Sequence, residues 1–235
     1  MRDSLCTYNS ESPTSHSNLN EISLGGKAGA VLKTREEVFS ESEEKHYEML
    51  DGLFYAIERS PNCLFAWNHA TDDIFSNFAT RVNDTSGNTQ QLFSAISHYF
   101  EEKQRPLTVF ATPFSEPKNL RTELEERGYK IAYRDAWMYY YGSQEEPVIA
   151  PAVNIEIIKT DGSMRRFVET FNKAYAGNDP REPYGQAPPA WGETLYSSFS
   201  LNTPGRLVEY FLLTENDLAS TVLITCRIGD YAGIY

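Results

Sequence analysis

The sequence predicts an α+β protein with a mixed, mostly antiparallel sheet flanked by helices. Two observations support this fold class. In the last third of the chain, β-branched and aromatic runs alternate with short turn clusters, which is typical of an antiparallel meander. Before it, similar short runs alternate with segments whose apolar residues recur at helical spacing. The 235 residues are enough for one large or two small domains.

Composition and charge narrow the classes of function. The formal net charge is −12, which argues against a broad basic surface for nucleic acid. The three cysteines lie far apart in the sequence, so we expect free thiols in a reducing cytoplasm and no metal site. No apolar run reaches the roughly 20 residues that cross a bilayer, so no membrane partner is expected.

The first half of the chain begins with polar sequence. Residues 1–35 are rich in Ser, Asn, Thr and Gly without a regular period, which predicts a disordered tail. From Glu36, apolar residues at helical spacing predict a helix that continues to Ile57 and ends before Pro61. Two strands are predicted after it, at residues 63–68 and 74–82.

The middle of the chain repeats helix and strand. Apolar spacing predicts a helix over residues 92–104, which Pro106 ends, and a short buried strand over residues 107–111. A helix over 119–127 closes at Gly128, and an aromatic strand follows. These elements make up a predicted lobe of residues 36–142, which the Pro- and Glu-containing linker of residues 143–152 separates from the rest.

Residues 153–235 form the second predicted domain. A strand at 154–159 precedes a helix that Asp161 or Ser163 caps. A Pro- and Gly-rich loop and a short helix at 191–199 follow. Three strands then complete the meander, at residues 207–213, 218–228 and 231–235.

This order of strand, helix, loop, short helix and three-strand meander resembles the first half of the GNAT superfamily of N-acyltransferases. The passage from Ile228 through Gly229-Asp230 to Ile234-Tyr235 is the most similar. Residues 91–141 resemble the second half of that fold, with Asn119 placed eight residues before Arg127. The resemblance therefore implies a degenerate GNAT-like lobe followed by a catalytic domain.

The resemblance implies acyl transfer from acetyl-CoA to a primary amine. In that family a Gly- and Arg-rich loop, which follows the meander, binds the pyrophosphate at a helix N-terminus. The sequence reaches Tyr235 before such a loop, so we expect a fragment of a longer protein that lacks the main coenzyme site and is inactive alone. A complete, non-catalytic GNAT-like binding or interaction module is the alternative.

The resemblance also implies site residues. Glu209, a carboxylate inside the terminal strands, is the candidate general base. The loop before the short helix lies where the family binds its acceptor, and its aromatic and acidic residues suit a cationic amine: Tyr175, Asp179, Glu182, Tyr184 and Trp191. Ile234 and Tyr235 end the strand next to the coenzyme.

Other motifs carry weaker signals. His69 and Asp73 fit an H-x-x-x-D pattern of other acyltransferases, but Ile74 replaces the glycine that commonly follows the aspartate, and a surface histidine is the better explanation. We expect Cys63 to be a buried strand residue and His98 to be a partly exposed helix residue. Trp137 and the tyrosines that follow it are expected in a core or an interface between lobes. The sequence leaves open which small-molecule or peptide amine is the acceptor, and whether the protein forms a homodimer.

Overall fold

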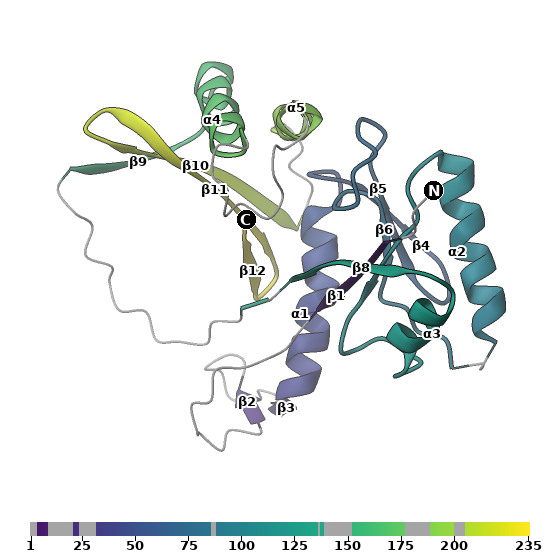
Figure 1. The fold of residues 1–235 in the computed structure, drawn as a ribbon. Helices are drawn as coiled ribbons and strands as arrows, with labels where there is room; N and C mark the ends of the chain where they lie inside the picture. The colour runs from purple at the N-terminus through teal and green to yellow at the C-terminus, as the bar shows by residue number, and fades with distance from the viewer. Residues whose placement is uncertain are drawn as a thin grey trace. The chain divides into compact units, whose positions relative to one another are not determined.

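The computed structural model describes residues 4–8, 21–23, 32–85, 88–135, 137–138, 152–176, 189–199 and 205–235. The chain divides into two compact units. The first comprises Met1–Glu48, Ile57–Ala66 and Asn77–Trp137, and the second Met49–Ala56, Trp67–Ser76 and Met138–Tyr235. Five helices and sheets of mixed and antiparallel type in the described residues confirm the predicted α+β class (Figure 1).

The first unit is built on a six-stranded sheet with the order β4-β5-β6-β7-β1-β8. Strands β6, β7, β1 and β8 run parallel to one another, and β5 runs antiparallel to β6. A separate hairpin joins β2 and β3. The strands of this unit are β1 (Ser4–Tyr8), β2 (Glu21–Ser23), β3 (Leu32–Thr34), β4 (Ala56–Arg59), β5 (Leu64–Trp67), β6 (Phe78–Thr80), β7 (Thr108–Ala111) and β8 (Lys130–Asp135).

Helices cover both faces of this sheet. Helix α1 (Arg35–Leu50) lies on one side, and α2 (Thr89–Lys103) and α3 (Leu120–Glu126) lie on the other (Figure 1). The side of α2 and α3 holds a buried apolar core that includes Ile96, Phe100 and Val109. The predicted helices and strand over residues 92–128 are confirmed, including Gly128 with a φ of +90° after α3.

Three predictions for the first unit are wrong in whole or in part. The strand predicted at residues 74–82 covers only Phe78–Thr80, after a turn. Residues 1–35 were expected to be a disordered tail, but Ser4–Tyr8 form β1, which pairs with both β7 and β8. The predicted helix to Ile57 ends at Leu50, where Gly52 turns the chain with a φ of +75°. Leu53 is nevertheless fully buried. The apolar spacing therefore predicted burial correctly but not the backbone conformation.

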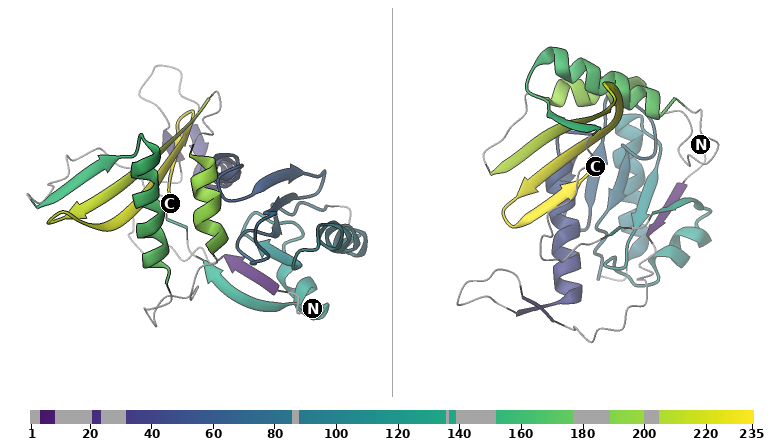
Figure 2. Two further views of the ribbon diagram at one scale, coloured as in Figure 1. Left: turned by 90° about the horizontal axis from the view of Figure 1, so that it is seen from above. Right: turned by 90° about the vertical axis from the view of Figure 1, so that its left-hand side faces the viewer.

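The second unit is built on a four-stranded antiparallel sheet with the order β12-β11-β10-β9 (Figure 2). This order confirms the predicted meander and the strand before it. Helices α4 and α5 follow β9 in the chain. The elements are β9 (Val153–Ile157), α4 (Asp161–Ala174), α5 (Pro189–Ser198), β10 (Arg206–Glu215), β11 (Leu218–Ile228) and β12 (Tyr231–Ile234).

One face of this sheet packs against both helices. Along β10, Val208, Tyr210 and Leu212 are buried, as the two-residue period of a strand requires. The Tyr210 ring lies 5.4 Å from that of Phe167 on α4, centroid to centroid, and its hydroxyl is 3.0 Å from the Ser198 hydroxyl on α5. Tyr210 therefore joins the sheet to both helices.

Local capping explains where α4 begins. The Thr160 hydroxyl accepts a hydrogen bond from the backbone N–H of Ser163, and the Ser163 hydroxyl contacts the backbone N–H of Thr160 in return. This is a capping box, which satisfies donors that the first helical turn leaves unpaired. The cap is thus Thr160, one residue before the predicted Asp161. None of the helices in the described ranges is long and apolar enough to cross a membrane.

Candidate functional site

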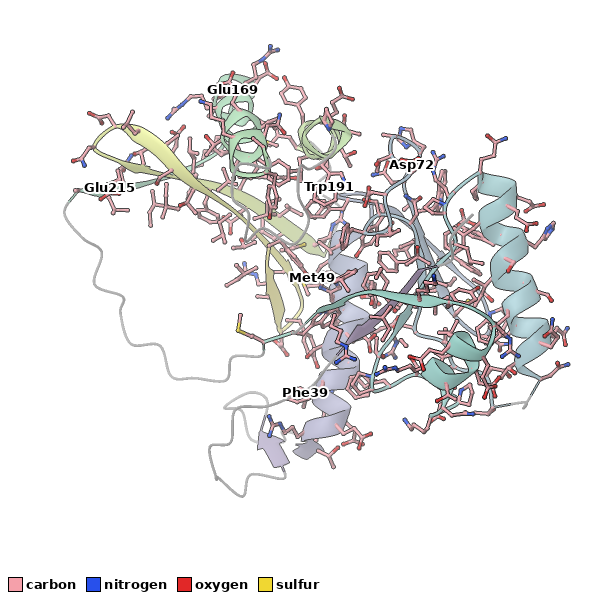
Figure 3. The ribbon with its side chains drawn as sticks, viewed as in Figure 1. Phe39, Met49, Asp72, Glu169, Trp191 and Glu215 are labelled. Carbon is pink, nitrogen blue, oxygen red and sulfur yellow. The ribbon has the colours of Figure 1, made fainter. Side chains whose placement is uncertain are left out.

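Trp191, in the first turns of α5, is the centre of an aromatic and acidic cluster in the second unit (Figure 3). Its indole Nε1–H donates a 2.9 Å hydrogen bond to Oδ2 of Asp73. The rings of Phe75 and Tyr175 each lie 6.2 Å from it, at interplanar angles of 88° and 70°. All four side chains are partly exposed, so the cluster is accessible from solvent.

Asp73 holds this cluster together. Its Oδ1 accepts hydrogen bonds from the backbone N–H groups of Phe75 and Ser76, at 2.8 and 3.0 Å. Its Oδ2 accepts from the Thr71 hydroxyl, at 2.9 Å, as well as from Trp191. The carboxylate therefore shapes its own turn and orients the indole, while it adds negative charge beside the aromatic rings.

Sequence reasoning found part of this cluster. Of the candidates for acceptor binding, Tyr175 and Trp191 are neighbours, and Asp179, Glu182 and Tyr184 lie outside the described residues. The acid beside Trp191 is Asp73, which the sequence indicates only as part of the H-x-x-x-D pattern with His69. A Thr-x-Asp segment before a turn predicts the local capping, but no local signal connects it to a tryptophan 118 residues away.

Glu209, the candidate base, does not share this site. It lies on β10 between the buried Val208 and Tyr210, so its side chain points to the opposite face of the sheet from α4 and α5. The sheet therefore separates Glu209 from Tyr175 and Trp191, which belong to the helical layer. The structure does not support Glu209 as the base for an amine bound at Trp191.

At the predicted coenzyme position, the end of β12, one backbone N–H group points away from the sheet's other strands. Tyr235 exchanges two backbone hydrogen bonds with Ile224 on β11, both of 2.9 Å. Because hydrogen-bonding direction alternates along an antiparallel strand, the N–H and C=O of Ile234 point away from β11, toward the edge of the sheet. Ile234 thus fits a backbone contact with a bound acyl group, whereas the backbone of Tyr235 is already paired.

The side chain of Tyr235 packs within the sheet. A Cβ atom on Gly233 would lie 2.3 Å from the Tyr235 hydroxyl, so the tyrosine occupies space that only glycine leaves free. Burial raises the pKa of the Tyr235 phenol well above its usual range. This tyrosine is therefore a packing residue that stays protonated.

A groove of about 530 Å³ runs between α4 and α5. Its walls include Arg165, Glu169 and Glu193, and the close approach of the helices at Gly192 forms part of it. Arg165 donates to Asp161 over 3.1 Å, and the Tyr196 hydroxyl also donates to Asp161. These donors hold the pKa of Asp161 below its usual range, with Tyr196 as the larger cause.

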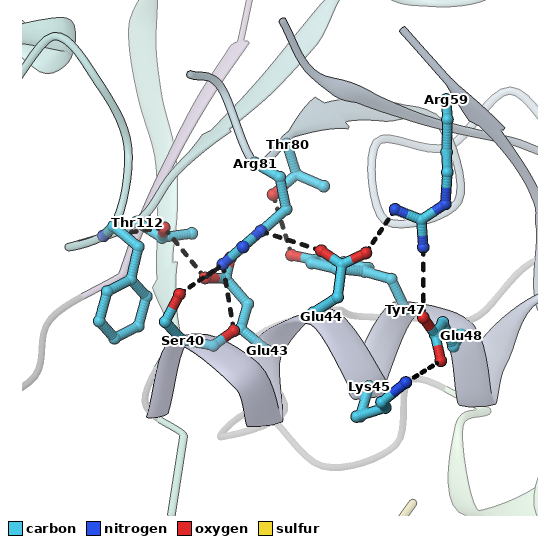
Figure 4. A network of polar contacts seen from close by, with 11 residues as sticks. Ser40, Glu43, Glu44, Lys45, Tyr47, Glu48, Arg59, Thr80, Arg81 and Thr112 are labelled. Carbon is cyan, nitrogen blue, oxygen red and sulfur yellow. Dashed lines mark hydrogen bonds and ion pairs between the residues drawn. The ribbon is translucent and has the colours of Figure 1, made fainter. Parts of the chain in front are cut away.

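The first unit contains a ladder of charged residues on α1 (Figure 4). Glu43 is buried and accepts hydrogen bonds from Arg81, at 3.0 Å, and from the Thr112 hydroxyl, at 3.4 Å. Burial raises the pKa of Glu43, and Arg81 opposes that shift. Arg81 and Thr112 directly follow β6 and β7, so the ladder fixes α1 to the ends of these strands.

The other motif residues have structural explanations. Burial raises the pKa of the Cys63 thiol to about 11, so this cysteine is not a thiolate near neutral pH. His98 is exposed on α2, 3.3 Å from Glu102, as predicted. Trp137 packs against His46 and Tyr47 of α1, which agrees with a core role.

Comparisons with known proteins leave the chain without an assigned family. No protein-family model matches it, no curated protein is significantly similar to it, and no solved structure matches its fold significantly. Within the described ranges, no group of three or more His, Cys, Asp and Glu side chains gathers where it could hold a metal ion.

Proposed function

We propose that the second unit is the acceptor side of a GNAT-type N-acyltransferase, which transfers an acyl group from acetyl-CoA to a primary amine. The observation that supports the proposal most is the order β9, α4, α5, β10, β11, β12, with the four strands paired antiparallel. This is the order that the sequence resemblance implies. Because one fold can host many functions, the site residues must also suit the chemistry.

The cluster around Trp191 suits the binding of an ammonium group. Aromatic faces attract cations within about 6 Å of the ring centroid. Trp191 and Tyr175 supply such rings, and the Asp73 carboxylate adds an attractive charge while it fixes the indole. These residues would bind and orient the amine; the group that takes its proton is not among them, because Asp73 already accepts four hydrogen bonds.

The edge of β12 suits the acyl donor. Bound acetyl-CoA would supply the acyl group as a thioester. The outward N–H of Ile234 could donate to the acyl carbonyl or to an amide of the pantetheine arm, and the backbone of Tyr235 keeps the strand in place through Ile224. The 235 residues contain no Gly- and Arg-rich loop for the pyrophosphate, so we expect titration calorimetry to find weaker than micromolar affinity for acetyl-CoA.

A titration with butylammonium tests the acceptor side, with 1-butanol as the uncharged probe of similar shape. The chain has three tryptophans, so the indole N–H signals of Trp67 and Trp137 serve as internal controls in a ¹⁵N NMR spectrum. We expect butylammonium to shift the Trp191 signal saturably and 1-butanol to leave it in place. Equal effects of the two probes, or no shift at Trp191, would contradict the proposal.

A non-catalytic interaction module is the second candidate. One observation favours it: β12 is paired with β11 at every position from Tyr231 to Tyr235. This candidate predicts slow hydrogen exchange at the amides of Gly233 and Tyr235. It also predicts no Trp191 shift with butylammonium, which distinguishes it from the enzyme.

A further inference from the structure

Among the described elements of the second unit, α4 and α5 both pack against one face of its sheet and leave the opposite face uncovered. Residues that alternate with the buried ones point away from α4 and α5, and the large apolar ones among them are partly exposed. Ile155 and Ile157 are 43% and 44% exposed, Leu207 is 39% exposed and Ile234 is 72% exposed. We call this surface the open sheet face.

Strand pairing makes the open sheet face continuous. Phe211 on β10 lies opposite Ile157 on β9 and Leu223 on β11. Cross-strand partners point to the same side of a sheet and touch each other. Glu156, which alternates with the two isoleucines, pairs with Arg166 on α4 and so marks the helical side. The apolar side chains of β9, β10 and β11 therefore form one patch.

An apolar patch of this kind is unusual on the solvent side of an antiparallel sheet. Such a sheet normally carries polar residues on its exposed face, and contiguous apolar surface marks an interaction site. In the first unit of this same chain, helices lie on both faces of the sheet. The open sheet face is thus more apolar than the exposed face of an antiparallel sheet normally is.

Two opposite charges lie within the patch. Glu209 is paired with Thr225 in the strand register, and Arg227 is paired with Leu207, so the two charged residues are diagonal neighbours on β10 and β11. Among the residues that the structure describes, neither forms an ion pair. An apolar partner would leave the two buried charges with only each other, whereas a partner that carries the opposite charges at matching positions would compensate both.

We propose that two copies of this chain dimerise through their open sheet faces. In a two-fold symmetric contact, each residue pair occurs twice, so Glu209 can meet the partner's Arg227 while Arg227 meets Glu209 of the partner subunit. A second copy therefore supplies the complementary acid, base and apolar surface together. Two sheets that pack face to face lie about 10 Å apart, and their inner side chains interdigitate.

Sedimentation velocity of the full 235-residue chain, from 1 to 200 μM, tests the proposal. We expect a concentration-dependent species of twice the 26.7 kDa chain mass. Glu209→Arg and Arg227→Glu should each weaken dimerisation by about tenfold or more, since each places like charges opposite one another. The double variant should restore it. Glu193→Arg, on the exposed surface of α5, is the matched control and should have no effect.

Two neutral variants test the same contact if a charge-reversed variant does not fold. Glu209→Gln and Arg227→Gln remove the pairing without like-charge repulsion, and far-UV circular dichroism checks that they fold. Each should weaken the dimer by a smaller factor. A chain that stays monomeric at 200 μM overturns the proposal and leaves the face to another partner. A dimer that is indifferent to Glu209 and Arg227 also overturns it, because its interface would lie elsewhere.

Discussion

Replacing Asp73 with asparagine should release Trp191 while it preserves the turn that Asp73 caps. The asparagine Oδ1 can still accept from the N–H groups of Phe75 and Ser76, as Asp73 does at 2.8 and 3.0 Å. Its amide nitrogen, however, would face the indole N–H, which now donates to Oδ2 and can only donate. The Thr71 hydroxyl, which also donates to Oδ2, can rotate and accept from the amide instead. At the indole, a donor would then oppose a donor.

The structure sets the size of the effect. A hydrogen bond to a charged group contributes about 1.5–3 kcal/mol, and the low end applies because Asp73 and Trp191 are only partly buried. We therefore expect Asp73→Asn to lower the free energy of unfolding of the second unit by about 1.5 kcal/mol, because the hydrogen bond from the indole is lost. The coupling to Trp191 alone should be about 1–1.5 kcal/mol.

A double-mutant cycle measures that coupling. Asp73→Asn, Trp191→Phe and the double variant are unfolded in urea and followed by far-UV circular dichroism. The double variant should be more stable than the sum of the single effects predicts, by the coupling energy. Asp72→Asn, an exposed neighbour, is the matched control and should change stability by less than about 0.5 kcal/mol. A coupling near zero, or an Asp72 variant as unstable as that of Asp73, would refute the anchoring role.

Three further predictions concern stability. Phe167→Ala should cost about 3–5 kcal/mol in urea unfolding, because Phe167 is fully buried between α4 and the sheet, whereas exposed Glu169→Ala should cost little. Thr160→Ala should cost about 1 kcal/mol, and Thr160→Ser should retain the cap; equal losses would argue against the capping box. Burial lowers the folded-state pKa of His46 to about 3, below its ordinary 6.5, so the unfolded state takes up the proton first. Stability should therefore fall as pH drops from about 6.5 toward 3, and His46→Phe should lose less stability than the wild type in urea titrations at each pH.

The second unit was predictable because its signals are local. The strand run from Leu218 to Ile228 and the Gly229-Asp230 turn determine a hairpin by themselves, and the structure has that hairpin. Sheet pairing within the meander then follows from chain order. The cap of α4 was predicted within one residue for the same reason, since it depends only on Thr160 and Ser163.

The parts that sequence reasoning missed depend on distant residues. Strand β1 was missed because it forms by pairing between β7 and β8, which lie more than 100 residues away in the sequence. Asp73 belongs to the site only because its carboxylate accepts a hydrogen bond from the Trp191 indole. The side of the sheet on which Glu209 lies follows from the burial of Val208 and Tyr210, and in a strand of mostly apolar residues the sequence alone does not fix which alternate set faces the helices.

The amide signals of β12 provide the most direct test of the proposed acyl-donor edge. S-acetylpantetheine carries the thioester and the pantetheine arm without the pyrophosphate, so its binding needs no phosphate loop. We expect it to shift the ¹⁵N–¹H signals of Ala232 and Ile234, whose N–H groups point to the sheet edge, and to spare those of Gly233 and Tyr235, which point to β11. Unchanged Ala232 and Ile234 signals at millimolar S-acetylpantetheine would contradict the account.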